Sequence, residues 1–172
     1  MFTCSPLVIR FGTLGDTASL TTLLHLLHLR YGKPCRLLGS GSWLEPLLAG
    51  HRDVQAIFRI ENPGRPYWLD PAQRRLVRQL RTRLQGAVYV CDDDRLDKIR
   101  GLLRRAGVLQ DQCRFANPDC LLQEGERWID RWQRFAAMTP PAFAAVPYRA
   151  GPQAPIAPRL AVNDHDREDP GN

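Results

Sequence analysis

The residues that decide the fold of this chain are Leu7–Asp16, LVIRFGTLGD, close to its amino terminus. An apolar run leads into a segment with two glycines, and Asp16 directly follows the second of them. A helical pattern of apolar residues begins at Thr17. This order predicts a buried strand, a tight turn and a carboxylate at the start of a helix. Ligands of open α/β sheets bind just outside the carboxyl ends of the strands, so Asp16 is the first candidate for a chemical role.

Beyond this segment, short apolar runs alternate with helical patterns up to about residue 138. The expected strands are 7–11, 35–38, 53–60 and 87–91, and the expected helices are 17–31, 43–48, 71–85, 94–106 and 124–138. Gly32, Gly86 and Gly107 stand where helices are expected to end. Strands that alternate with helices over short connections predict an α/β fold, a Rossmann-like, mostly parallel sheet with helices on both faces.

Proline dominates the chain after residue 139, with six prolines between residues 140 and 158. This composition is typical of a linker. Residues 159–162, RLAV, resemble the beginning of a further strand, and a polar run follows them. We therefore expect one domain over residues 1–139, and over residues 140–172 a Pro-rich linker with the truncated start of a missing second domain.

The amino-acid composition indicates an ordinary globular protein. The 172 residues are 44% hydrophobic and 24% charged, which is ordinary for a globular domain. The five cysteines are odd in number and contain no C-x-x-C pair, so free thiols in a reducing compartment are expected. Neither a secretory signal nor a run of ~20 apolar residues is present. We expect a cytoplasmic protein, with peripheral contact to the inner membrane left open.

The net charge of +6 is concentrated in part on the expected helix 71–85. Its arginines are Arg74, Arg75, Arg78, Arg81 and Arg83. A solvated helix face, an anionic lipid or glycolipid surface, and nucleic acid are the three interpretations, in that order of preference. No nucleic-acid-binding motif accompanies the charge and no aromatic residues are interleaved with it, so no nucleic-acid partner is expected.

Three other groups contain residue types that bind metal ions. Asp92, Asp93 and Asp94 follow a strand and match the D-x-D metal motif of sugar transferases, although a loop and helix cap is the preferred interpretation. His25 and His28 lie three residues apart on a helix without a visible acidic partner, which favours packing or exposure. Cys113 and Cys120 have no histidine nearby. We expect no metal and no cofactor.

The opening turn has the spacing G-x-x-G, so it lacks the three glycines of the dinucleotide fingerprint. Spacing alone favours a structural interpretation, in which Gly15 is a turn residue and Asp16 caps the helix.

The opening segment also resembles the amino-terminal signature of glycosyltransferase family 9, the ADP-heptose:lipopolysaccharide heptosyltransferases. That signature is an apolar strand, an arginine, two variable residues, a small residue, then Leu-Gly-Asp and a Thr-Pro-rich helix. Here it covers residues 8–16 and the residues that follow. The similarity continues to about Gly107, and more loosely over residues 128–139. It implies a GT-B fold of two Rossmann-like halves. The amino-terminal half would bind the lipopolysaccharide core acceptor, and the other half an ADP-sugar donor. Transfer would invert the anomeric centre without a metal.

The resemblance also assigns roles to residues. Asp16 is similar to the proposed general base, which takes a proton from the acceptor hydroxyl. The acceptor-side turn would be shaped by Gly12, Thr13, Leu14 and Gly15. The backbone amides of residues 13–16, at the helix start, could hold phosphate or a developing negative charge. Arg10 would contact anionic groups of the acceptor or form a structural salt bridge.

The chain departs from the family pattern in two places. The helix start LTTL at residues 20–23 lacks the usual proline, and the donor-binding lysine and the Asp/Ser-Gly-x-x-His segment have no counterpart. The expected activity is therefore that of an incomplete glycosyltransferase. Two alternatives are a non-catalytic lipopolysaccharide- or protein-binding module and a nucleotide-binding regulatory domain.

Overall fold

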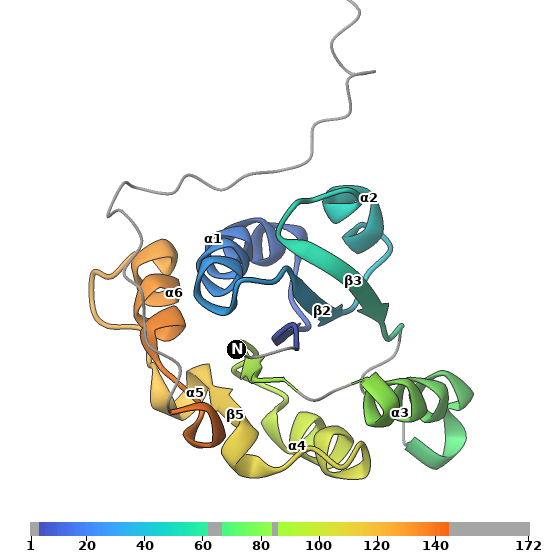
Figure 1. Cartoon of the computed structure of the whole chain (residues 1–172). Coiled ribbons are helices and arrows are strands. Elements are labelled where there is room, and N and C mark those ends of the chain that lie inside the picture. Colours follow the sequence, from blue (N-terminus) through green and yellow to red (C-terminus); the bar gives the residue numbers. More distant parts are fainter. Residues whose placement is uncertain (1–3, 62–66, 84–85, 145–172) are drawn as a thin grey trace, which may run out of the picture.

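The computed structural model describes residues 4–61, 67–83 and 86–144, which form a five-stranded sheet flanked by helices (Figure 1). The strands are β1 (Leu7–Arg10), β2 (Cys35–Gly39), β3 (Val54–Arg59), β4 (Val88–Val90) and β5 (Cys113–Phe115). Their order is β3-β2-β1-β4-β5, and every neighbouring pair is parallel. This confirms the predicted α/β class. The three-residue β5 was not predicted, because its sequence, Cys-Arg-Phe, is too short to show a pattern.

Helices cover both faces of the sheet. The α-helices are α1 (Leu14–Tyr31), α2 (Leu44–Leu48), α3 (Pro71–Arg83), α4 (Leu96–Arg105), α5 (Ala116–Asp119) and α6 (Trp128–Ala137). The described residues also form the short 3₁₀ helices η1 (Tyr67–Leu69), η2 (Gln110–Gln112) and η3 (Pro141–Phe143). One apolar cluster joins the sheet to α1, α2 and α6, and the other joins it to α3 and α4. Figure 1 shows α3 and α4 together on one side of the sheet.

The central strand β1 explains why the opening segment decides the fold. It pairs with β2 on one side and with β4 on the other. Leu7, Val8 and Ile9 have no exposed surface, and they alternate between the two apolar clusters. Each such burial contributes about 1.5–3 kcal/mol. Because the strands are parallel, the ends of β1, β2 and β4 meet at one edge of the sheet.

Helix α1 begins at Leu14, three residues earlier than predicted. Thr13 is its N-cap, and Asp16 is the third residue of the helix. The backbone N–H of Thr13 donates to Asp16 Oδ2, and the backbone N–H of Asp16 reaches the Thr13 hydroxyl. This capping box satisfies donors at the helix start and draws the helix back to Leu14. The structural interpretation was right that Asp16 takes part in capping the helix but wrong about the positions: Thr13 is the N-cap, and Gly15 lies inside the helix.

Two other helices, α4 and α6, begin later in the sequence than predicted. Helix α4 begins at Leu96, because Asp92 Oδ1 accepts hydrogen bonds from the backbone N–H groups of Asp94 and Arg95 and holds them in a turn. Helix α6 begins at Trp128 rather than at residue 124, and the preceding residues form a turn in which Gln123 N–H donates to Glu126. Side-chain acceptors thus determine where α4 and α6 begin. The spacing of apolar residues in the sequence does not reveal these hydrogen bonds.

The described residues reach Ala144, and Phe143 of η3 is buried against the cluster that contains α1 and α6. The expected domain boundary between residues 139 and 140 stays a prediction. Most of the Pro-rich segment, including the strand expected at 159–162, lies outside the described residues. Within the described residues, no helix has the length and apolar character that membrane crossing requires.

Candidate functional site

An open cleft of about 480 Å³ lies at the edge of the sheet where β1, β2 and β4 end. Its walls come from the loops that follow four strands, and they carry five carboxylates and two guanidinium groups. The lining residues are Arg10, Phe11, Gly12, Thr13, Asp16, Ser40, Glu61, Asp92, Asp93, Asp94 and Arg95. Four predicted site residues, Arg10, Gly12, Thr13 and Asp16, are therefore brought together. The other two, Leu14 and Gly15, open α1 beside the cleft, and their acceptor-binding role stays a prediction.

Asp16 is held on both of its carboxylate oxygens. Oδ2 accepts from the Thr13 backbone N–H at 2.7 Å and from the Thr13 hydroxyl at 2.9 Å. Oδ1 accepts from Arg10 Nη2 at 3.0 Å. An ionised carboxylate offers about four acceptor positions, so one remains on Oδ1. With its side chain 31% exposed, Asp16 can reach a hydroxyl in the cleft.

The same contacts set the protonation state of Asp16. Partial burial raises the pKa of its carboxyl group, but hydrogen bonds from Thr13 and the charge and hydrogen bond of Arg10 outweigh burial. The pKa of Asp16 therefore lies below its usual value. The carboxylate is ionised at neutral pH, as a proton acceptor must be.

Part of the phosphate site expected at the start of α1 is already occupied by the chain itself. The N–H groups of Thr13 and Asp16 are engaged in the capping box. The Asp16 carboxylate itself occupies the positive end of the helix dipole and repels a second anion there. The capping box therefore weighs against phosphate at the amides of Thr13 and Asp16, whereas for the amides of Leu14 and Gly15 the expectation stays a prediction.

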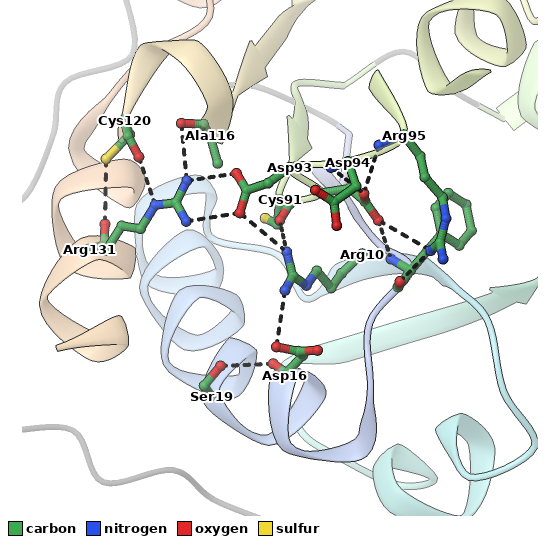
Figure 2. Close-up of polar contacts among 12 residues, drawn as sticks. Arg10, Asp16, Ser19, Cys91, Asp93, Asp94, Arg95, Ala116, Cys120 and Arg131 are labelled. Carbon is green, nitrogen blue, oxygen red and sulfur yellow. Dashed lines mark hydrogen bonds and ion pairs between the residues drawn. The ribbon is translucent and has the colours of Figure 1, made fainter. Parts of the chain in front are cut away.

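Arg10 is a structural ion-pair partner, one of its two predicted roles. Its Nη1 donates to the carbonyl oxygen of Cys91, and its Nη2 donates to Asp16 (Figure 2). The side chain is only 12% exposed, and its Nε has no hydrogen-bond partner within the described part of the chain. Arg10 thus ties the end of β1 to the end of β4 and to the first turn of α1.

Gly12 is required for space. A Cβ at this position would lie 2.6 Å from both the Cβ and the Oδ2 of Asp16, and 2.9 Å from Arg10 Nε. At Gly15, the nearest atom to a Cβ is Thr13 Oγ1 at 4.0 Å, an ordinary contact. The two glycines of the opening motif therefore differ: the first permits the Arg10–Asp16 contact, and the second does not need to be glycine.

Gly12→Ala is expected to destabilise the protein by about 1–3 kcal/mol, because Asp16 must move away from the new methyl group. Gly15→Ala is the matched control and is expected to be neutral or to stabilise by up to about 1 kcal/mol, because alanine is the better helix former. Urea unfolding monitored by circular dichroism measures both. Equal effects of the two substitutions would contradict the close contact at Gly12.

The three consecutive aspartates have separate tasks. Buried Asp92 accepts from the backbone N–H of Phe11 at 3.0 Å and also holds the turn before α4. Asp93 forms a two-pronged ion pair with Arg131, at 2.9 and 3.1 Å. Asp94 is exposed. The carboxylates of Asp92 and Asp93 thus already accept hydrogen bonds from other groups of the protein, which favours the loop-and-cap interpretation. Among the described residues, no group of three His, Cys, Asp or Glu side chains is arranged to hold a metal ion.

Sequence reasoning missed Arg131 on α6. Its side chain is 2% exposed and also donates to the backbone carbonyls of Cys120 and Ala116. The guanidinium carbon lies 5.1 Å from the ring centre of Trp128 and 5.2 Å from that of Trp132. The periodic aromatic residues of α6 were visible in the sequence, whereas the arginine between them reads as an ordinary exposed residue.

A second polar cluster lies at the opposite end of the sheet, before β3. His25 Nδ1 lies 3.2 Å from one oxygen of Asp53, and His28 Nδ1 lies 2.6 Å from the other. The Asp53 side chain is 2% exposed. The acidic partner that the sequence did not reveal is thus Asp53, and the histidines pack against it. Burial raises the pKa of Asp53, but the hydrogen bonds and charge of His28 and His25 outweigh it, so this pKa lies below its usual value.

Asp53→Asn is expected to lower the free energy of unfolding by about 2 kcal/mol at neutral pH, because a buried, hydrogen-bonded carboxylate is lost. The pKa of Asp53 is lower in the folded protein than in the unfolded chain, where an aspartate has a pKa near 3.9. The ionised carboxylate therefore stabilises the fold at pH values above about 3.9, and this stabilisation is lost as the pH falls through the folded-state pKa. The difference between wild type and variant should therefore shrink below about pH 4. Urea unfolding at a series of pH values tests this, and a constant difference would contradict it.

The basic face of α3 is exposed, as the preferred interpretation of the sequence requires. Arg74, Arg75 and Arg78 line a shallow pocket of about 460 Å³ together with Tyr67 and Pro71. The pocket lies on the helix, apart from the residues that line the cleft.

The five cysteines are free, and those at 35, 91, 113 and 120 are buried. The thiol of Cys113 donates to Leu109 O and that of Cys120 to Arg131 O, so the two act separately rather than as a metal pair.

Comparisons with known proteins identify the fold. No family model and no curated protein matches the sequence. Among solved structures, E. coli ADP-heptose lipopolysaccharide heptosyltransferase II matches with a TM-score of 0.65 and 18% sequence identity. The match covers 95% of this chain and 48% of that one, so the chain spans about half the length of this neighbour. At this identity the likeness establishes the Rossmann-like architecture, equivalent to half of a GT-B protein.

Proposed function

We propose that this chain is the acceptor-binding half of a glycosyltransferase similar to the heptosyltransferases, with the lipopolysaccharide inner core as acceptor and an ADP-sugar as donor. The observation that carries the proposal is the Asp16 carboxylate, which is ionised, anchored and partly open in a cleft at the end of the central strand. The structural likeness to heptosyltransferase II supports the same reading.

In the proposed reaction, Asp16 is the general base. An acceptor hydroxyl donates to the open position on Asp16 Oδ1 and loses its proton there as its oxygen attacks the anomeric carbon of the donor sugar. The bond from that carbon to the ADP oxygen breaks, ADP leaves with the electron pair, and the anomeric centre is inverted. Arg10 and Thr13 hold the carboxylate so that it need not reorient.

The charge of the chain fits an anionic acceptor. The net charge is +6, and Arg74, Arg75 and Arg78 form an exposed basic face on α3. A lipopolysaccharide core carries phosphate and acidic sugars, so this face would favour its approach by electrostatic attraction. We propose a cytoplasmic location with peripheral contact to the inner membrane. No nucleic-acid partner and no cofactor are part of the proposal.

Two measurements test the proposed function. Calorimetric titration of the chain with lipopolysaccharide inner core measures acceptor binding, and a neutral oligosaccharide of equal size is the control. Incorporation of labelled sugar from ADP-heptose measures transfer, with the chain alone and with the donor-binding half of heptosyltransferase II added. We expect core binding by the chain alone, and transfer only when the donor half is added.

The alternatives predict different results. Core binding without transfer under either condition would favour a non-catalytic binding module. Nucleotide binding to the chain that is insensitive to Asp16→Asn would favour a regulatory nucleotide-binding domain, although the self-capped start of α1 argues against a phosphate there. Absence of core binding would contradict the proposal.

A further inference from the structure

We propose that Asp93 is a positioning residue for Asp16, because Asp93 anchors the Arg10 guanidinium and limits it to a single contact with the Asp16 carboxylate. The consequence for sugar transfer rests on the proposed function, in which Asp16 is the base. The link between the two carboxylates is a property of the folded chain and can be measured without transfer.

Four charged side chains alternate in sign along the edge of the sheet where the strands end (Figure 2). Arg131 on α6 pairs with Asp93 in the loop after β4. Asp93 Oδ2 lies 3.8 Å from Arg10 Nη1, and Arg10 Nη2 lies 3.0 Å from Asp16 Oδ1. The row thus connects the first turn of α1 to a helix more than 100 residues later in the chain.

Asp93 and the carbonyl oxygen of Cys91 orient the Arg10 guanidinium from the side opposite Asp16. A guanidinium is a rigid fork that can bind both oxygens of a carboxylate at once. Here Nη1 is turned toward Asp93 and donates to the carbonyl oxygen of Cys91, so Nη2 alone donates to Asp16. This single contact keeps an acceptor position open on Oδ1, where the proposed reaction needs it.

Asp93 is itself immobilised. Both of its oxygens are held by Arg131, which is buried and lies against the rings of Trp128 and Trp132. Removal of the Asp93 charge would leave two guanidinium groups near each other with no carboxylate between them. The Arg10 charge would then act on Asp16 alone and stabilise its ionised form further.

The other charged groups of the cleft have different partners. Asp92 faces Arg95 at 4.0 Å and accepts from the Phe11 backbone, and Glu61 pairs with Arg59 at 3.2 Å. Asp94 is exposed. Among the described residues, Asp93 and Asp16 are the carboxylates that contact Arg10. The effect on Asp16 is therefore expected to be specific to Asp93.

The experiment is an NMR titration of the intact chain labelled with ¹³C at the aspartate carboxyl carbons. In Asp93→Asn, the titration midpoint of Asp16 is expected to fall by about half to one pH unit, because a neighbouring negative charge is lost. Asp130→Asn is the matched control, since it removes the same charge from an exposed pair with Arg127. A change of less than about 0.2 pH units in the Asp16 midpoint of Asp93→Asn would overturn the proposal. A shift of equal size in the Asp130→Asn control would also overturn it.

A second variant keeps the test decisive if Asp93→Asn does not fold. Asp93→Ser also removes the charge and should lower the midpoint of Asp16 by a similar amount. An unchanged Asp16 midpoint in that variant would overturn the proposal. In the transfer assay, the acid side of the pH profile is expected to follow the Asp16 titration. A titration shift without a matching change in the profile supports the link between the carboxylates and contradicts Asp16 as the base.

Discussion

Asp16→Asn is expected to reduce sugar transfer by about 10²- to 10⁴-fold, the usual contribution of a positioned general base. The amide has almost the size of the carboxylate but cannot accept the proton of the acceptor hydroxyl. Acceptor binding should stay within about threefold of wild type, because the cleft keeps its shape. The measurements are initial rates with labelled ADP-heptose in the presence of a donor half, and calorimetry with the core acceptor.

The substitution also weakens the start of α1. The amide loses the charge that faces Arg10 and part of the capping box, at a cost of about 1 kcal/mol. Asp97→Asn is the matched control, because Asp97 is also an aspartate in the first turn of a helix, in α4, and its side chain is fully exposed. Transfer by the control should equal that of wild type. Retention of more than about a tenth of the wild-type rate in Asp16→Asn would exclude Asp16 as the base.

The strand in the opening segment could be predicted because its information is local. The apolar run 7–11 predicts a buried strand, and β1 (Leu7–Arg10) is the central strand of the sheet. The position of Asp16 at the end of that strand predicted the cleft, and the structure places it there. The roles within the turn were less visible, because the difference between Gly12 and Gly15 depends on where the Asp16 and Arg10 side chains lie.

The partners of buried charges could not be predicted from the sequence. Asp93 and Arg131 are 38 residues apart, and Asp53 lies 25 residues beyond His28. Nothing in the local pattern of either partner distinguishes it from an exposed residue. The pairings arise only when parallel strands bring the loops after β1 and β4 together, and when α6 packs beside α1. Spacing rules describe residues within one helix or one strand, so they cannot pair Arg10 with Asp93.

Arg131→Met is expected to lower the free energy of unfolding by about 3 kcal/mol, the largest stability change of the substitutions considered. The methionine fills much of the space between Trp128 and Trp132, so the loss is mainly polar. It removes a two-pronged ion pair with Asp93 and leaves the carbonyl oxygens of Cys120 and Ala116 without this donor. Breaking one side of a buried ion pair costs about 3–5 kcal/mol, and the partial exposure of Asp93 places the effect at the lower end.

Arg127→Met, at the N-cap of α6, provides the matched control. Arg127 also forms a two-pronged pair, with Asp130, but its side chain is 76% exposed. Exposed pairs contribute about 0–1 kcal/mol, so this variant should unfold at nearly the wild-type urea concentration. If burial is the cause, the double substitution Arg131→Met with Asp93→Leu should regain part of the loss, because the carboxylate that lost its two-pronged partner is removed as well. Equal destabilisation by Arg127→Met and Arg131→Met would show instead that the buried guanidinium contributes no more than a surface ion pair, and the row of charges from α6 to Asp16 would lose its anchor.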